Sequence, residues 1–352
     1  MTTTAIAYAT SSPTTPFERI EIERRELGPK DVLIDIQFAG ICHSDIHTAR
    51  GEWGEVNYPL VPGHEIAGVV REVGSAVGKY APGDHAGVGC FVDSCGECEQ
   101  CRDHHEQFCT GNETLRGTVW TYDGTGRDGQ PTHGGYSTSI VVNEDYVCRI
   151  PDEIPLDQAA PLLCAGITMY SPLRRWGAGP GTKVAIIGMG GLGHMGVQIA
   201  AAMGAEVHVI SQTRSKEEDA RRFGATALHA TSEPGALKKL RGTFDLMIST
   251  ISDTTDLGSY LRALKPRGVL ANVGLPEHGF EMHLGPLVNG SRVLAGSQIG
   301  GIKETQEMLD FCATHGLAAQ VEVIGGEDIT AAYDRVVGSE VRYRYVIDTS
   351  TF

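Results

Sequence analysis

The chain has 352 residues, of which 41% are apolar and 21% charged, a balance typical of a globular protein with two domains. Its net charge of -15 argues against nucleic acid as a partner, and no apolar stretch is long enough to cross a membrane. The N-terminus shows no secretory signal, so we expect a cytoplasmic protein. Nine cysteines in such a chain indicate metal ligands and reduced thiols in place of disulfides.

Residues 1 to about 150 are rich in short apolar runs, glycine and proline. Residues 32–39 alternate apolar and other side chains and are predicted to form a strand, and residues 66–74 form a second strand that ends in a glycine turn. No long helical period occurs here. This region is therefore predicted to be a partly open β-barrel or sandwich with functional loops.

Groups that bind metals follow the first of these strands. The segment 40–47 contains Cys42, two histidines, a serine and an aspartate, while His64 and Cys164 lie further along the chain. Two thiolates and one imidazole would leave the fourth position of a tetrahedral zinc ion open, which is the mark of a catalytic site. From spacing alone, the alternative is a buried thiol and a hydrogen-bonded histidine.

A second cysteine cluster lies in a loop at about residues 90–110. It consists of Cys95, Cys98, Cys101 and Cys109. Four thiolates close a tetrahedral shell completely, so a zinc ion here is predicted to be structural. An iron–sulfur cluster and a disulfide pair are the alternatives. Cys90, Cys148 and Cys312 receive no functional assignment.

From residue 151 the sequence pattern changes to apolar strands that alternate with helical segments. A short apolar strand at 183–187 is followed by a glycine-rich turn and then by a helix at 194–203 and a strand at 207–210. This order of elements around a G-x-G-x-x-G turn predicts a dinucleotide site, because a pyrophosphate can approach the first turn of the helix. The residues of the turn assigned to the cofactor are Gly188, Gly190, Gly191, Leu192 and Gly193.

The alternation of strands and helices continues through 244–248, 257–264, 269–273 and 293–297. Residues 151–295 are therefore predicted to form a doubly wound parallel sheet of the Rossmann type. Residues 296–352, with a helix at 303–314 and a strand at 342–347, are expected to return to the first domain.

The end of the second strand of this unit indicates which cofactor binds. An acid there would bind the ribose 2′-hydroxyl of NAD, but this chain has Ser211, Thr213, Arg214 and Lys216. Hydroxyls and cations suit a 2′-phosphate, so NADPH is predicted. The alternative is a solvated helix start with Ser215 as its N-cap.

Taken together, these motifs resemble the zinc-dependent medium-chain dehydrogenases, most of all the branch similar to cinnamyl alcohol dehydrogenase. The resemblance spans nearly the whole chain and includes segments 40–47, 63–65, 188–193 and 341–348, with the four-cysteine loop. It implies a GroES-like catalytic domain, a Rossmann cofactor domain, one catalytic and one structural zinc ion, NADPH, and a homodimer.

The resemblance also implies roles for individual residues. Cys42, His64 and Cys164 would be ligands of the catalytic zinc ion, and Glu65 would approach that ion when water leaves. Asp45 would orient His64. The remaining roles are a proton relay through Ser44 and His47, pyrophosphate contacts from His43 and Arg344, nicotinamide packing by Thr168, and a substrate pocket shaped by Trp53 and Trp120.

The expected reaction is hydride transfer between NADPH and an aldehyde or primary alcohol, with aromatic or medium-chain aldehydes as the expected substrates. One rival is a zinc-containing reductase of activated C=C bonds, against which the presence of Ser44 and His47 argues. Other rivals are a polyol or sugar dehydrogenase and, from another class, a non-catalytic NADPH-binding protein.

Overall fold

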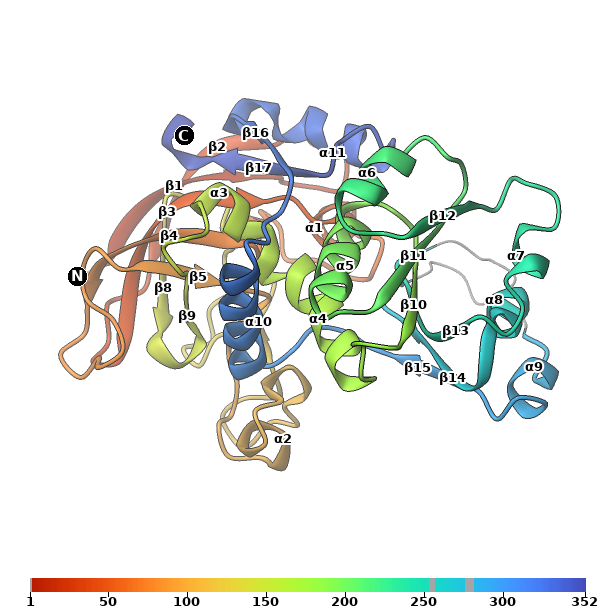
Figure 1. Ribbon diagram of the computed structural model, residues 1–352. Coiled ribbons are helices and arrows are strands. Elements are labelled where there is room, and N and C mark those ends of the chain that lie inside the picture. The colour runs from red at the N-terminus through yellow and green to blue at the C-terminus, as the bar shows by residue number, and fades with distance from the viewer. Residues whose placement is uncertain (1, 253–256, 276–281) are drawn as a thin grey trace. The chain divides into compact units, whose positions relative to one another are not determined.

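The computed structural model describes residues 2–252, 257–275 and 282–352 (Figure 1). The chain divides into two compact units. Unit 1 contains Met1–Cys164 and Gly300–Phe352, and unit 2 contains Ala165–Ile299.

Unit 1 is built on a seven-stranded sheet with the order β16-β17-β3-β4-β5-β9, in which β8 also pairs with β3. Its strands are β3 (Asp31–Gly40), β4 (Ile66–Val73), β5 (His85–Val88), β8 (Ser139–Asn143), β9 (Cys148–Arg149), β16 (Val321–Ile324) and β17 (Arg344–Asp348). Because β17 pairs antiparallel with β3, the end of the chain completes the sheet that the N-terminal part begins.

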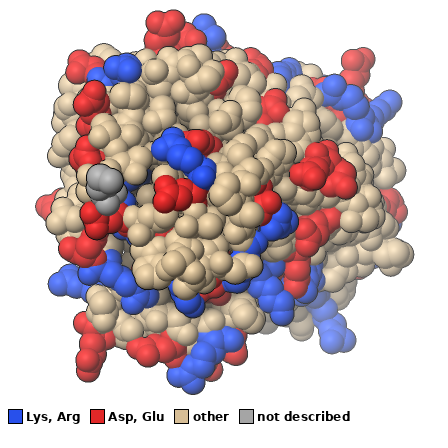
Figure 2. All heavy atoms as spheres, turned by 90° about the vertical axis from the view of Figure 1, so that its left-hand side faces the viewer, with Lys and Arg blue, Asp and Glu red and all other residues tan. Residues whose placement is uncertain are grey.

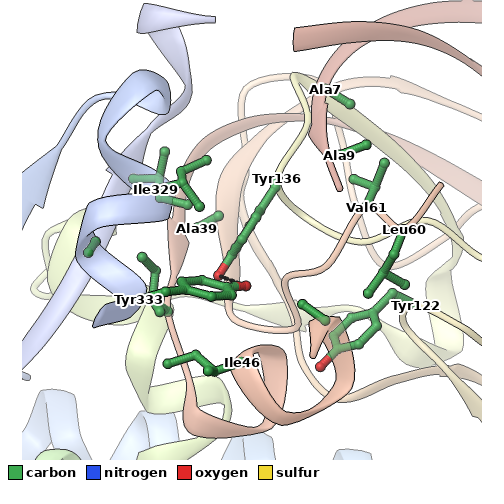
Figure 3. Packing of buried hydrophobic residues seen from close by; sticks show 14 of the residues in the cluster. Ala7, Ala9, Ala39, Ile46, Leu60, Val61, Tyr122, Tyr136, Ile329 and Tyr333 are labelled. Carbon is green, nitrogen blue, oxygen red and sulfur yellow. Dashed lines mark hydrogen bonds between the residues drawn. The ribbon is translucent and has the colours of Figure 1, made fainter. Parts of the chain in front are cut away.

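Two strand pairs and short helices complete unit 1. The pairs are β1 (Thr3–Ala9) with β2 (Glu18–Arg24), and β6 (Phe91–Asp93) with β7 (Val119–Trp120). The helices are α1 (His43–Ala49), α2 (Glu99–Arg102), α3 (Leu156–Ala159), α10 (Ile302–His315) and α11 (Ile329–Val337). A cluster of buried side chains from β1, β3, α1 and α11 forms a core that includes Tyr122, Tyr136 and Tyr333 (Figure 3).

Unit 2 is a six-stranded sheet in which every neighbouring pair runs parallel. Its strands are β10 (Lys183–Ile187), β11 (Glu206–Ser211), β12 (Ala227–Ala230), β13 (Phe244–Ser249), β14 (Leu264–Asn272) and β15 (Val293–Gly296). Their order is β12-β11-β10-β13-β14-β15, which is the 3-2-1-4-5-6 order of a Rossmann sheet. The apolar runs of β10 and β13 are buried, as expected of central parallel strands.

The helices of unit 2 among the described residues are α4 (Ala165–Arg175), α5 (Gly191–Ala202), α6 (Glu217–Arg222), α7 (Ala236–Lys239), α8 (Leu257–Ala263) and α9 (Gly285–Val288). The helices predicted at 194–203 and 257–264 correspond to α5 and α8, whereas α4, α7 and α9 were not predicted. A buried cluster around Phe244, Met247 and Leu261 fills the space between the sheet and α8.

The expected boundary at residue 150 lies ahead of the division between the units. Residues 151–164 contain α3 and a 3-10 turn, Ala160–Leu163, and both contact β3 and β4 of unit 1. This packing keeps Cys164 in the same unit as Cys42 and His64.

Among the described residues, no helix is long and apolar enough to cross a membrane. On the face shown in Figure 2, acidic and basic side chains are interspersed among larger uncharged areas.

Candidate functional site

The strand pairing of unit 1 brings the first set of metal-binding residues together. Strands β3 and β4 are antiparallel neighbours with Ala39 opposite Ile66, so the end of β3 lies beside the start of β4. Cys42 comes just after β3 at the start of α1, and His64 comes just before β4. Cys164 joins them from the end of the 3-10 turn.

The geometry of this cluster suits a zinc ion. Ligand atoms of Cys42, His64, Glu65 and Cys164 all lie within 4.8 Å of one another, and the two sulfurs are 3.9 Å apart. Two sulfurs bound tetrahedrally at about 2.3 Å from zinc would be about 3.8 Å apart. The hydrogen bond with Cys164, together with the proximity of His64, lowers the pKa of Cys42 well below its usual value.

Asp45 forms a hydrogen bond with His64 on the side of the imidazole that carries Nδ1. Its Oδ1 atom lies 2.9 Å from His64 Nδ1, and its other oxygen accepts from the Cys42 amide at 2.8 Å. Because an ionised carboxylate only accepts hydrogen bonds, Nδ1 carries the proton and Nε2 is the atom left for a metal. Asp45 therefore lies where the resemblance placed an orienting residue, with no exposed surface.

Glu65 and Arg344 form a buried ion pair beside this cluster. Arg344 Nη2 donates to Glu65 Oε1, while Glu65 Oε2 is buried without a hydrogen-bond partner among the described residues. Burial raises the pKa of Glu65 to about 7, although Arg344 acts in the opposite direction. An unpartnered carboxylate oxygen next to two thiols and an imidazole fits a cation. The pyrophosphate contact predicted for Arg344 stays a prediction.

The four-cysteine loop forms a second cluster, with ligand atoms also within 4.8 Å of one another. The Cys95–Cys101, Cys98–Cys101 and Cys98–Cys109 sulfur pairs are 3.8, 3.5 and 4.0 Å apart, close to the edges of a zinc–sulfur tetrahedron. Hydrogen bonds from the Cys101 and Thr110 amides lower the pKa of Cys98 to about 5. All nine cysteines are free thiols.

The relay candidates lie on α1. The Ser44 hydroxyl is 3.7 Å from Cys42 Sγ, and His47 lies almost one turn further along the helix. His43 is exposed on the same helix. Trp53 and Trp120 are partly exposed, and the Trp53 ring stacks on His47 with ring centres 4.9 Å apart.

Sequence reasoning missed Glu52, whose carboxylate accepts from His47 Nδ1. The turn at Gly51, with φ +67°, folds the chain back over α1, and the Glu52 amide donates to His47 O at 2.9 Å. The sequence did offer a signal for this contact, because Glu52 follows His47 by five residues and a glycine lies between them.

In unit 2, the glycine-rich turn joins β10 to α5 as predicted. Gly188 has φ +93°, and a Cβ on Gly193 would lie 2.0 Å from Gly188 O, so both positions require glycine for the turn and for helix packing. A Cβ on Gly190 would meet no described heavy atom within 4 Å. Open space at this point fits the approach of a pyrophosphate to the helix start. Thr168 lies buried in α4 of this unit.

The cations at the end of β11 differ in their surroundings. Lys216 Nζ donates to Met189 O, inside the glycine-rich turn, at 2.8 Å. Arg214 instead binds two carboxylates, with its Nε 2.6 Å from Glu233 and its Nη1 2.9 Å from Glu217. Glu233, which the sequence reading missed, follows β12, the neighbour of β11.

Ser215 is not the N-cap of α6, so that part of the alternative is wrong, but residues 212–215 are exposed and a solvated helix start stays open. The N-cap of α6 is Lys216, without a side-chain capping bond, and the Ser215 hydroxyl lies 3.0 Å from that of Thr213. Ser211, the last residue of β11, is partly exposed. The hydroxyls of Ser211, Thr213 and Ser215 therefore do not cap α6.

Comparisons with known proteins agree with this arrangement. Residues 28–152 match the family model of the alcohol dehydrogenase GroES-like domain, and residues 191–314 match that of zinc-binding dehydrogenases. The chain is 60% identical over 348 residues to NADP-dependent alcohol dehydrogenase C 1 of Mycolicibacterium smegmatis, covering 99% of each chain.

Solved structures show the same similarity over the full length. A cinnamyl alcohol dehydrogenase of Sorghum bicolor has a TM-score of 0.94 and 39% identity, covering 99% of this chain and 98% of its own. The enzyme CAD of Helicobacter pylori, solved in complex with NADP(H), has a TM-score of 0.92 and 44% identity, covering 99% of both chains. The chain belongs to the zinc-dependent alcohol dehydrogenase family, with a GroES-like domain and a Rossmann domain.

Proposed function

We propose that this protein is a zinc-dependent oxidoreductase that transfers a hydride between NADPH and an aldehyde or primary alcohol. The observation that carries the proposal is the buried cluster of Cys42, His64 and Cys164, with the unpartnered oxygen of Glu65 beside it. The NADP-dependent relatives and the glycine-rich turn support the cofactor. Aromatic or medium-chain aldehydes are the proposed substrates.

In this proposal, a zinc ion would polarise the substrate oxygen as a Lewis acid and the nicotinamide would carry the hydride. Cys42, His64 and Cys164 would hold the ion, and the hydrogen bond between Asp45 and His64 Nδ1 leaves the Nε2 atom of His64 available to it. A second structural ion is proposed for the four-cysteine loop.

The residues of α1 move the proton. Ser44 lies next to Cys42, where it can exchange a hydrogen bond with the substrate oxygen, and His47 lies further out on the same helix. Because Glu52 accepts from Nδ1 of His47 and Trp53 stacks on the ring, the imidazole is fixed with Nε2 left to exchange a proton. These contacts support a proton relay that ends at His47.

The test is a panel of aromatic and aliphatic aldehydes assayed with NADPH, together with a zinc count. We expect aldehyde-dependent NADPH oxidation and two zinc ions per chain. A single ion with no turnover of any aldehyde or alcohol would contradict the enzyme and favour a non-catalytic cofactor-binding protein.

The surroundings of the two cations lead to a prediction on cofactor choice. Lys216→Ala is expected to raise the NADPH Michaelis constant about 10- to 100-fold, because a hydrogen bond to a charged group is worth ~1.5–3 kcal/mol. NADH lacks the 2′-phosphate, so its Michaelis constant should change little. Initial rates with both cofactors measure the effect.

Arg214→Ala is the matched variant. Arg214 binds two carboxylates, Glu217 and Glu233, which would compete with a phosphate, whereas Lys216 donates to a neutral carbonyl inside the glycine-rich turn. Loss of Arg214 should therefore weaken NADPH less than the loss of Lys216 does. A larger selective effect for Arg214 would restore it as the main phosphate contact. An equal loss of NADPH and NADH in both variants would refute this reading of the pocket.

We also propose a homodimer formed through unit 2, located in the cytoplasm. Strand β15 is an edge of the parallel sheet, and Leu275, Leu284, Val288 and Val293 are exposed apolar residues near it in sequence. Nine free thiols suit a reducing compartment. Light scattering that gives the mass of a single chain would contradict the dimer.

A further inference from the structure

A segment remote in sequence lies against the loop that carries His64. We call residues 133–139 the strap and residues 61–64 the ligand loop. The three consecutive amides of residues 134–136 donate to carbonyl oxygens of residues 61–63 at 2.8–3.0 Å. A Cβ on Gly63, whose φ is +104°, would lie 2.6 Å from the Tyr136 ring, so this ring packs directly on the residue before His64.

The hydroxyl of Tyr136 reaches the carboxylate that orients His64. Tyr136 donates to Asp45 Oδ2 at 3.5 Å. Tyr333 in turn donates to the Tyr136 oxygen at 3.3 Å (Figure 3). Neither Tyr136 nor Asp45 has exposed surface. Burial, together with the charge of Asp45, raises the pKa of Tyr136 well above its usual value, so this hydroxyl keeps the proton that it donates. A chain of donors therefore ends on Asp45.

The strap is fixed in turn by Arg24, a buried residue of β2. Its guanidinium donates to the carbonyl oxygens of His133, Gly134 and Ser139 at 2.6, 2.9 and 2.8 Å. It also donates to the Ser137 hydroxyl at 2.6 Å. Burial lowers the pKa of Arg24 to about 9, which leaves the guanidinium charged at neutral pH. Four short bonds from one planar group make the strap a rigid support.

We propose that Tyr136 and Arg24 are positioning residues for the metal ligand His64. Arg24 fixes the strap through four hydrogen bonds, and Tyr136 acts on His64 through its contacts with Asp45 and Gly63. The inference rests on the zinc chemistry proposed above. In this proposal, Tyr136 and Arg24 raise the zinc affinity of the active site in addition to any effect on the stability of the fold.

The test compares zinc binding at the two metal sites of the same chain. Tyr136→Phe keeps the ring and removes only the hydroxyl. The active-site zinc is expected to bind about three- to tenfold more weakly, since one buried hydrogen bond is lost, while the four-cysteine site stays unchanged. Competition with a chelator measures both affinities. A Cys42→Ser protein, which should keep only the zinc ion of the four-cysteine loop, identifies which affinity belongs to which site.

Arg24→Lys is the second variant, since it keeps the charge but cannot make all four bonds. It should also weaken the active-site zinc selectively and lower kcat with little change in the Michaelis constant for NADPH. Arg25→Lys is its control, because Arg25 is the next residue in sequence but pairs with Asp31 away from the strap.

Two results would overturn the inference. One is an unchanged zinc affinity in Tyr136→Phe, and the other is an equal weakening of both sites, which is the signature of a merely structural role. A wild-type protein with zinc only in the four-cysteine loop is a different result, which would overturn the proposed function and this inference with it.

Discussion

Cys42→Ser is expected to abolish the zinc-dependent reaction while leaving the fold intact. A serine hydroxyl is a poor zinc ligand, so the ion held with His64 and Cys164 should be lost. Polarisation of the substrate oxygen by a metal is worth several kcal/mol, and each 1.36 kcal/mol is tenfold in rate. Turnover should therefore fall by about a thousandfold or more, with one zinc ion left per chain in metal analysis.

Cys312→Ala is the matched control for this experiment. Cys312 is also buried, but its sulfur contacts Met308 within α10, a helix that contains none of the candidate metal ligands. This variant should keep two zinc ions and the turnover of the wild type. Wild-type turnover in a Cys42→Ser protein that lacks the active-site ion would exclude the zinc mechanism.

Cys98→Ser is expected to act on stability. Binding of a structural zinc ion contributes directly to folding, so its loss should cost several kcal/mol and lower the melting temperature by about 10 °C or more. The effect should spread beyond the loop, because Glu106 accepts from the Ile302 amide at the start of α10, at 3.2 Å. Melting curves and zinc analysis on the same samples give the result.

The control for the loop is Phe108→Ala. Phe108 lies between the cysteine ligands in sequence, and 47% of it is exposed, so its removal should shift the melting temperature by only about 1–2 °C. A Cys98→Ser protein that has lost this zinc ion but melts with the wild type would show that the ion does not support the fold.

Local sequence pattern was enough to predict five of the six strands of unit 2, but not β12. The strand predicted at 183–187 has the same bounds as β10, because the apolar run ends at a glycine whose positive φ closes it. The helix after it begins at Gly191 and not at 194, since the glycines of the turn belong to the first helical turn. Both groups of candidate metal ligands could also be predicted from the sequence, because zinc is bound by cysteine and histidine side chains.

Features that depend on pairing between distant segments could not be predicted in this way. Arg214 is predicted as a phosphate contact because it is a cation at the end of the second strand of this unit, where an NAD enzyme would have an acid. Its partner Glu233 comes from the end of β12, and only the register of β11 with β12 brings the two together. The contact of the strap with the ligand loop is of the same kind, because no local signal links residue 136 with residue 63.

The two metal clusters differ in how much of the chain each one spans. The ligands of the four-cysteine loop fall between residues 95 and 109, whereas those of the other cluster run from residue 42 to residue 164. During synthesis from the N-terminus, the first set is complete while the second still lacks its last thiol. The four-cysteine loop can therefore bind an ion during synthesis, before all candidate ligands of the active-site cluster have been made.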